Sequence, residues 1–291
     1  MAGATGDLGF RIAQALLNRG AAVRALVRPG ATKPEVAQLR AQGATIVEVD
    51  LGDAKALATA CAGAACVVSA LSGLRDVIID AQTQLLDAAV AAGVPRFIPS
   101  DYSIDFTKLP EGSNRNLDLR REFGRRLDQA PIRATSVLNG MFMDLLTGQA
   151  PVILFKIKRV LYWGSADQPL EFTTIADTAA FTAAAALDPT TPRYLRVAGE
   201  VATVRDLQAA ASAATGQRFR RLRAGGLWVL KLMIRITRRL VPAPKEVFPP
   251  WQGMQYLHNM FTGLANFESL DNDRYPGLKW TKVGEVLATR K

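Results

Sequence analysis

The chain has 291 residues, enough for one large domain or for one domain with an additional lobe. Its hydrophobic content of 49% fits a globular protein, and no uninterrupted apolar stretch is long enough to cross a membrane, because Lys231 and three arginines break the best candidate, residues 227–241. The net charge of +10 would suit nucleic acid, but no nucleic-acid-binding motif accompanies it, so that function is disfavoured.

Cysteine and histidine usage excludes further classes of site. Cys61 and Cys66 have neither the spacing nor the histidine partners of a zinc site, so we expect small buried side chains and no bound metal. A single histidine, His258, argues against a Ser-His-Asp triad. The N-terminus also lacks the basic region and apolar run of a secretory signal, which indicates a cytoplasmic protein.

The chain opens on a glycine-rich segment, Gly3-Ala4-Thr5-Gly6-Asp7-Leu8-Gly9, that leads directly into a predicted helix at residues 8–19. Glycines at three-residue intervals allow backbone N–H groups at a helix N-terminus to approach a pyrophosphate without interference from Cβ atoms. The helix that follows at once and the β-rich run beyond it strengthen this weak motif. The segment therefore predicts a dinucleotide site.

Only Met1 and Ala2 precede the first glycine, whereas a Rossmann glycine loop normally follows an apolar strand of about five residues. Either the native start lies upstream or the sheet manages without its central strand. The first explanation is favoured, because removing a central parallel strand leaves the ladders of both neighbours unpaired. We expect this short start to lower stability and cofactor affinity.

The predicted strand at residues 22–27 ends in Arg28, and no acidic residue lies between Asp7 and Glu35. An NAD-selective fold usually places Asp or Glu at this strand end, against the ribose 2′-hydroxyl. The planar cation of an arginine can instead pair with a 2′-phosphate and stack on adenine. NADP(H) is therefore favoured over NAD(H).

Further β-rich runs alternate with Ala- and Leu-rich helical patterns along the first half. The other strands are predicted at residues 45–49, 66–70, 96–99 and 135–138, and a second clear helix at residues 80–92, before Gly93. This alternation is typical of βαβ units. It predicts an α/β fold with a Rossmann-type, doubly wound parallel sheet.

After Gly140 the alternation is less regular. Strands are predicted at residues 151–163 and 193–197, helices at 175–187 and 204–214, and from about residue 222 an irregular lobe rich in proline and aromatic residues. We expect residues 1–150, joined again by 172–205, to form the dinucleotide-binding domain. Residues 206–291, with 151–171, would form a smaller substrate-binding lobe.

Residues 227–241 predict an amphipathic helix with Leu230, Met233, Ile234 and Val241 on one face and four basic residues on the other. The favoured interpretation is that the apolar face lines a substrate pocket. Peripheral contact with an anionic membrane and binding of a regulatory protein stay open as alternatives.

Several segments, in their order and spacing, resemble the NmrA-like and isoflavone-reductase-like branch of the atypical short-chain dehydrogenases. The matching segments are residues 3–9, 26–28, 49–51 and 68–73, Gln82, and residues 96–102, 139–142 and 172–177. The resemblance covers nearly the whole chain and implies an NAD(P)-binding protein.

The resemblance also implies roles for individual residues. The pyrophosphate would be bound by Gly3, Thr5, Gly6, Asp7 and Leu8, with Gly9 closing the motif, the 2′-phosphate would be bound by Arg28, and the adenine would be bordered by Asp50 and Leu51. The nicotinamide ribose would lie beside Ser69, Ala70, Leu71 and Gln82. The reactive end of the cofactor would face Pro99, Ser100, Asp101 and Tyr102, with Asn139 and Met141 closing that side.

One departure from the family concerns catalysis. Its reductases carry a lysine on the helix before the sixth strand, but residues 116–130 contain none, and Arg120 or Arg121 stands at the equivalent place. Arginine can orient and polarise a substrate but is a poor proton donor. Tyr102 is the favoured donor, whereas Tyr275-Pro276-Gly277-Leu278-Lys279 only imitates a dehydrogenase motif, because Pro276 and Gly277 disfavour a helix there.

The leading hypothesis is an NADPH-dependent reductase of a small carbonyl, quinone or aromatic ether. The alternative is a regulatory protein that senses NAD(P) without turning it over. The missing lysine favours the regulator, and the aromatic-rich C-terminal region favours the enzyme.

Overall fold

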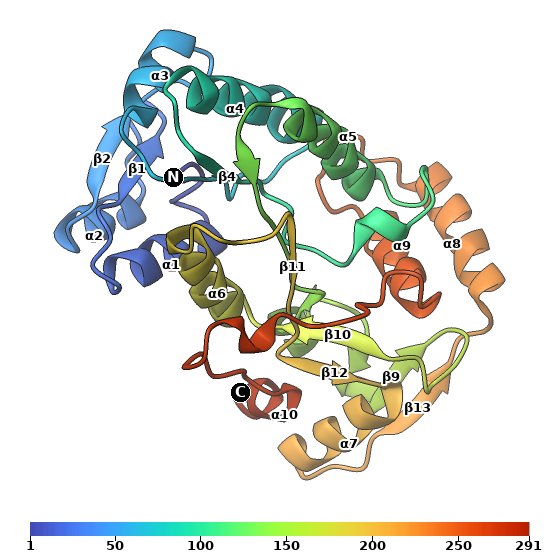
Figure 1. Ribbon diagram of the computed structural model, residues 1–291. Helices are drawn as coiled ribbons and strands as arrows, with labels where there is room; N and C mark the ends of the chain where they lie inside the picture. The colour runs from blue at the N-terminus through green and yellow to red at the C-terminus, as the bar shows by residue number, and fades with distance from the viewer. Residues whose placement is uncertain (291) are drawn as a thin grey trace.

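The computed structural model describes residues 1–290, and the first half of the chain alternates strands and helices (Figure 1). Its strands are β1 (Arg24–Val27), β2 (Thr45–Glu48), β3 (Val67–Val68), β4 (Arg96–Ile98), β5 (Arg133–Ala134) and β6 (Ser136–Leu138). Its helices are α1 (Asp7–Leu17), α2 (Pro34–Ala41), α3 (Ala54–Cys61), the π-helix η1 (Asp76–Ala81), α4 (Gln82–Ala91), the 3₁₀-helix η2 (Phe106–Lys108) and α5 (Arg115–Gln129). Each strand predicted there is present and slightly shorter than predicted.

Parallel pairing joins these strands in series. β1 pairs with β2, β3 with β4, and β4 with β5. Ala2 lies between the β1–β2 pair and the group of β3, β4 and β5, and it forms parallel bridges to Leu26 and Ser69. Its backbone N–H and carbonyl make hydrogen bonds of 2.9 and 3.0 Å to the backbone on the β3 side. The start of the chain therefore holds the central position of the sheet. Beyond β5, Thr135 leads into β6, which pairs in parallel with β11 (Tyr194–Arg196).

Helices cover both faces of this sheet: α1 and α6 (Ile175–Leu187) lie on one face, and α3, α4 and α5 on the other (Figure 1). Successive side chains of a strand point to opposite faces. Accordingly, Val68 and Ile98 join the hydrophobic cluster with α1 and α6, whereas Val67 and Phe97 join the cluster with α4 and α5. The architecture is a Rossmann-like α/β fold.

The remaining elements belong to the second half of the chain. The strands are β7 (Met141–Phe142), β8 (Ile153–Leu154), β9 (Arg159–Tyr162), β10 (Leu170–Thr173), β12 (Glu200–Ala202) and β13 (Arg220–Arg223). The helices are η3 (Met143–Thr147), η4 (Phe155–Ile157), α7 (Val204–Thr215), α8 (Leu227–Leu240), α9 (Pro250–Phe261), η5 (Asn272–Arg274) and α10 (Val283–Ala288). β10 pairs with β7 and β12, and β9 pairs with β8 and β13. One hydrophobic cluster joins these strands to α7, α8, α9 and α10.

Two predictions for this half are wrong. The single strand predicted at residues 151–163 is a hairpin, because β8 and β9 pair antiparallel and Lys158 turns the chain with a φ of 53°. The region predicted to be irregular from about residue 222 contains, besides the predicted helix α8, two unpredicted helices, α9 and α10. Pro250 begins α9, where proline sacrifices no intrahelical hydrogen bond and its fixed φ suits the helix.

The amphipathic helix predicted at residues 227–241 is confirmed as α8, and its inward face packs against the hydrophobic core, while a substrate pocket along this face stays a prediction. Leu230 is fully buried in the core, and Met233 and Ile234 pack against the same cluster. α8 lies at the outer edge of the molecule with α9 beside it (Figure 1). Among residues 1–290, each helix is too short or too polar to span a bilayer.

Candidate functional site

Five predicted site segments follow parallel strands of the sheet. They begin with Gly3 after Ala2, Arg28 after β1, Ser69 after β3, Pro99 after β4 and Asn139 after β6. The carboxyl ends of parallel strands meet at one edge, where open α/β sheets bind their ligands. The topology therefore brings these segments to a single edge, which we call the carboxyl edge.

The glycine loop packs so tightly that two of its glycines are required. Gly3 has a φ of +76°, and a Cβ there would lie 2.4 Å from the carbonyl oxygen of Ala70. A Cβ on Gly9 would lie 2.1 Å from the carbonyl oxygen of Gly3. Gly6 is the N-cap of α1 and has no side chain to cover the first turn. The positive end of α1 is thus open to an anion.

The adenosine end of the predicted site is exposed. Arg28 follows β1 and is exposed, while the Gly30 N–H donates to the Glu48 carboxylate at 3.1 Å. Asp50 accepts a hydrogen bond from the Gly52 N–H at 2.9 Å, and Leu51 packs against the cluster with α3. Asp7 in the first turn of α1 forms an exposed ion pair with Arg11 at 2.6 Å. Thr5 and Leu8 are half-buried.

Hydrogen bonds join three predicted residues in the middle of the edge. The Ser100 hydroxyl donates to the Leu71 carbonyl at 2.6 Å, and the Ser100 N–H donates to the Gln82 side chain at 2.9 Å. Gln82 in turn donates to the Ile78 carbonyl within the π-helix η1 at 3.1 Å. The loop after β3, the end of β4 and the start of α4 are thereby fixed together.

Two buried polar side chains at this edge lack protein partners. The Ser69 hydroxyl and both polar atoms of the Asn139 amide make no hydrogen bond among residues 1–290, although both residues are fully buried. An orphaned buried polar group costs about 1–3 kcal/mol. Together with the close-packed glycine loop, these groups fit a polar ligand lying along the edge, as a dinucleotide would.

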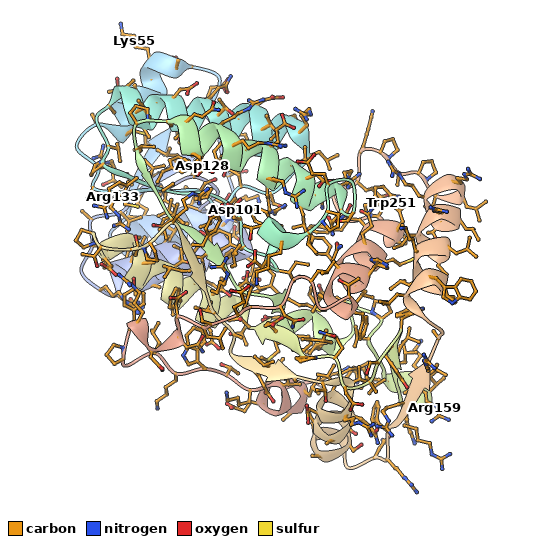
Figure 2. The ribbon with its side chains drawn as sticks, turned by 45° about the vertical axis from the view of Figure 1, so that its right-hand side comes forward. Lys55, Asp101, Asp128, Arg133, Arg159 and Trp251 are labelled. Atoms are coloured by element: carbon orange, nitrogen blue, oxygen red, sulfur yellow. The ribbon has the colours of Figure 1, made fainter. Side chains whose placement is uncertain are left out.

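Asp101 lies in the interior, below α5 (Figure 2). Its Oδ2 accepts a hydrogen bond from the Ser136 hydroxyl at 2.7 Å, and Arg193 donates to the same hydroxyl at 2.6 Å. Burial raises the pKa of the Asp101 carboxyl, although Ser136 and the charges of Arg120 and Arg193 act in the opposite direction. Its Oδ1 has no hydrogen-bond partner among the described residues, nor has the buried Nε of Arg120.

The two arginines predicted to replace the family lysine have different surroundings. Arg121 donates to the Phe106 and Leu109 carbonyls at 2.6 and 2.7 Å and to Asp118 at 3.0 Å, so it fixes the loop around η2. The charge of Arg120 instead acts on Asp101. Of the two, Arg120 is the one whose charge reaches this buried carboxyl.

Tyr102 points to the opposite side of the sheet from its neighbour Asp101. It belongs to the hydrophobic cluster with α1 and α6, and its hydroxyl is buried without a hydrogen bond in the described chain. Burial raises the pKa of Tyr102 well above its usual range. Tyr275 packs at the margin of the same cluster, against Phe181, and its hydroxyl donates to Asp188 at 2.8 Å, whereas Lys279 does not share a helix with it.

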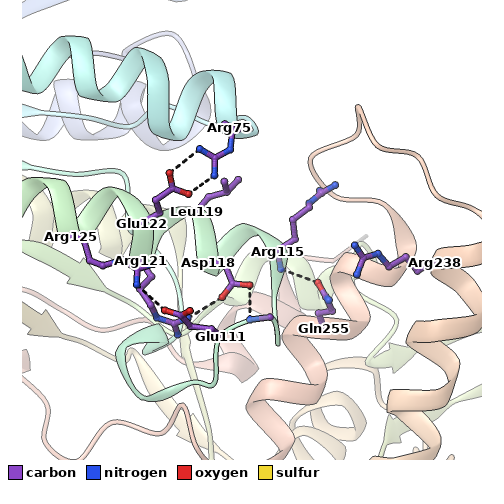
Figure 3. A pocket seen from close by; sticks show the side chains of 11 residues that line it. Arg75, Glu111, Arg115, Asp118, Leu119, Arg121, Glu122, Arg125, Arg238 and Gln255 are labelled. Atoms are coloured by element: carbon purple, nitrogen blue, oxygen red, sulfur yellow. Dashed lines mark hydrogen bonds and ion pairs between the residues drawn. The ribbon is translucent and has the colours of Figure 1, made fainter.

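A cleft of about 410 Å³ lies on the outer side of α5, facing Arg238 of α8 and Gln255 of α9 (Figure 3). Only Arg121 among the predicted site residues lines it. Ion pairs such as Arg75–Glu122 and Arg125–Glu111 neutralise much of its charge. We therefore take the carboxyl edge, rather than this cleft, as the candidate site.

Sequence reasoning missed Ser136 and Arg193, which contact the Asp101 region. Arg193 reaches Ser136 because it immediately precedes β11, which pairs with β6. No local pattern marks either residue, since their proximity depends on a strand pairing between distant segments.

The parallel sheet with a glycine-rich loop at the start of α1 defines a Rossmann-like α/β protein. The chain belongs to the NmrA-like family, which it matches over residues 1–283. The family resemblance inferred from the sequence is therefore confirmed.

Several known proteins similar to this chain are reductases. It is 27% identical over 302 residues to isoflavone reductase homolog IRL of Zea mays, covering 98% of this chain and 95% of that protein. It is 31% identical over 223 residues to pinoresinol reductase 2 of Arabidopsis thaliana, covering 70% of each. The solved structure of AtPrR2 with NADP+ and (+)-pinoresinol has a TM-score of 0.81 at 25% identity and covers 99% of this chain and 96% of that chain. The protein is thus a distant homologue of such reductases.

Proposed function

We propose that this protein is an NADP(H)-dependent reductase of a small aromatic carbonyl, quinone or aromatic ether. The observation that carries the proposal is the carboxyl edge, where the open end of α1 and the unpartnered Ser69 and Asn139 side chains lie along one line of strand ends. The similarity to isoflavone and pinoresinol reductases supports the substrate class.

The residues that would hold the cofactor are those of the predicted site. The glycine loop, Gly3 to Gly9, would bind the pyrophosphate, because its N–H groups stand at a helix N-terminus. Arg28 would bind the 2′-phosphate, and Asp50 with Leu51 would border the adenine. Ser69, Ala70, Leu71, Gln82, Pro99, Ser100 and Asn139 would contact the nicotinamide half.

The bound cofactor would supply hydride, and the chain would then have to polarise the substrate oxygen and provide a proton. Arg120 suits the first task, because a guanidinium is a cationic hydrogen-bond donor and its charge acts on the buried Asp101 carboxyl. Two groups could supply the proton, the Tyr102 hydroxyl and the Asp101 carboxyl, whose pKa is raised by burial. Because they point to opposite sides of the sheet, only one of them would face the substrate.

The second candidate function is that of a regulator that binds NADP(H) without turning it over. Two observations favour it: α5 contains no lysine, and the Tyr102 hydroxyl is buried in the core. In that case, cofactor binding would change the stability of the fold, and a partner protein would distinguish the cofactor-bound from the cofactor-free protein.

NADPH oxidation should be measured against a panel of aromatic carbonyls, quinones and aromatic ethers, together with the affinities for NADPH and NADH. The reductase proposal expects turnover of at least one substrate class and tighter binding of NADPH. Tight NADPH binding with no turnover of any substrate would support the regulator, and failure of both cofactors to bind would contradict both functions.

Single substitutions then assign the proton donor. Our prediction for Tyr102→Phe is a turnover about 10²–10⁴-fold lower with nearly unchanged NADPH affinity, since only a phenolic proton is removed. Tyr275→Phe is the matched control and should leave turnover intact. If instead Asp101→Asn abolishes turnover and Tyr102→Phe does not, the donor lies on the α5 side of the sheet.

A further inference from the structure

The outward face of α8 exposes an unusual amount of apolar surface. Seven of the twelve exposed large hydrophobic residues in the described chain lie between residues 222 and 248: Leu222, Trp228, Leu232, Ile236, Leu240, Val241 and Phe248. Four of them recur at every fourth position of α8, so they form one row along the helix. With a rise of 1.5 Å per residue, this row is about 18 Å long. Its two ends, Trp228 and Leu240, are the most exposed, at 73% and 76%.

The apolar row of α8 is not part of the hydrophobic core. The inward face of α8 already provides the core contacts, through the buried Leu230 and the half-buried Met233 and Ile234. A soluble domain seldom leaves a contiguous apolar row uncovered unless another surface binds there.

A basic row runs beside the apolar one. Successive residues of a helix are turned by about 100°, so Arg235 and Arg239 project within about 20° of Trp228, and Lys231 and Arg238 lie farther round on the side away from Leu240. None of the ion pairs in the described part of the chain involves these four residues, although the Arg238 guanidinium also lies over the Trp251 ring, 5.2 Å from its centroid. A hollow of about 650 Å³ on this face is lined by Leu232 and Ile236 together with Arg235, Arg238 and Arg239.

The surroundings of α8 are also basic. Residues 207–245 contain nine arginines and lysines and no acidic residue, and all four residues of β13 (Arg220–Arg223) are exposed. This surface is therefore attracted to an anionic partner and repelled by a cationic one.

We propose that α8 docks on an anionic lipid bilayer, with Trp228, Leu232, Ile236 and Leu240 at the acyl boundary and the basic row against the lipid phosphates. An interfacial helix has this composition, one apolar row beside cations, with a tryptophan at the depth of the headgroups. The position of α8 at the edge of the molecule leaves it accessible to a flat surface (Figure 1).

Charge distinguishes a bilayer from the other occupants of such a face. A second copy of this chain would bring the same nine cations against the first, which opposes association. A nucleic acid would satisfy the cations but would leave the apolar row in water. An anionic bilayer would pair its phosphates with the basic row and at the same time remove the apolar row from water.

Co-sedimentation with vesicles tests the proposal on the full chain. We expect binding to vesicles of equimolar phosphatidylcholine and phosphatidylglycerol, weaker binding at high salt, and little binding to phosphatidylcholine alone. Each basic residue near such a surface is worth about fivefold in partitioning, so Arg235→Gln with Arg239→Gln should weaken binding about 25-fold. Trp228→Ser with Leu240→Ser should weaken it at least as much.

Matched controls separate α8 from general effects of charge and hydrophobicity. Arg19→Gln with Arg40→Gln removes two exposed arginines elsewhere, and Leu187→Ser with Leu264→Ser removes two apolar side chains that are 48% and 50% exposed. Both controls should bind anionic vesicles like the wild type, and all four variants should keep the wild-type melting temperature and NADPH affinity. The proposal is overturned if the wild-type protein does not bind anionic vesicles, or if the controls lose as much binding as the α8 variants. It is also overturned if light scattering shows that the apolar row of α8 joins two copies of the chain instead.

Discussion

Neighbouring residues of similar chemistry have different roles in this protein. Arg120 and Arg121 are adjacent on α5, yet Arg121 donates to two carbonyls around η2 and to Asp118, whereas the charge of Arg120 acts on the buried Asp101. Asp101 and Tyr102 are likewise adjacent and lie on opposite sides of the sheet. At the residue scale, the direction of a side chain decides which groups can act together.

Arg28 is the residue on which cofactor preference depends. Arg28→Glu should weaken NADPH binding far more than NADH binding, because an ionic hydrogen bond of roughly 1.5–3 kcal/mol is replaced by repulsion from the 2′-phosphate. Titration calorimetry with both cofactors measures the difference, and Arg40→Glu, on the exposed side of α2, is the control. Equal losses for both cofactors would contradict the role of Arg28.

Asp188 gives stability a pH dependence. Partial burial by itself would raise its pKa, but hydrogen bonds from Thr190, Tyr275 and Arg274 hold the pKa below its ordinary value of 3.8. The stabilisation is therefore complete above the unfolded-state pKa and is lost as the pH falls through and below that value.

Asp188→Asn should lower the free energy of unfolding by roughly 1–3 kcal/mol at neutral pH. Because the variant has no carboxyl to protonate, its stability should fall less steeply than that of the wild type between about pH 4 and pH 2. Urea denaturation at several pH values measures both effects, with the exposed Asp87→Asn as control. Parallel pH curves for Asp188→Asn and the wild type would refute this account.

Elements follow the local sequence where backbone requirements are local. The α1 loop has glycines where Cβ atoms would meet backbone, and α9 begins at a proline. The hairpin of β8 and β9 is the counterexample: its apolar residues suit one long strand, and the reversal at Lys158 depends on pairing of the two halves.

A pair of Gly→Ala substitutions tests the packing of α1. A Cβ on Gly9 would lie 2.1 Å from a backbone oxygen that cannot move freely, so Gly9→Ala should destabilise the fold by about 1–3 kcal/mol and weaken NADPH binding. Gly253 in α9 has open space around its Cβ position, so Gly253→Ala should stabilise by about 0.5–1 kcal/mol. Thermal denaturation compares them, and an unchanged stability of Gly9→Ala would disprove the close approach.

At the scale of the whole molecule, buried hydrogen bonds join α5 to α9. The fully buried Asn114 caps α5, accepts from the Gln252 amide at 2.6 Å and donates to Asn259 at 3.2 Å. These contacts cross between the two regions that the sequence predicts as a dinucleotide domain and a substrate lobe. That division, and the expected cytoplasmic location, stay predictions.

Asn114→Ala should destabilise by about 2–4 kcal/mol, because the N-cap is lost and two buried amides lose a partner. Hydrogen exchange should accelerate in α9 as well as in α5. Asp53→Ala, which removes the exposed cap of α3, should cost only about 1 kcal/mol and leave α9 unaffected. If α9 exchanges at the wild-type rate in Asn114→Ala, the two regions are not coupled through this residue.

The sequence alone determined the alternation of strands and helices, the required glycines of the α1 loop, the position of Arg28 at a strand end and the family resemblance. These features are local, because apolar spacing and backbone conformation are encoded by neighbouring residues. Only the tertiary structure decided which arginine acts on the buried Asp101 carboxyl, that Tyr102 enters the core, and that α8 presents a second apolar row to solvent. Each of these depends on contacts between segments far apart in the chain, which no local pattern specifies.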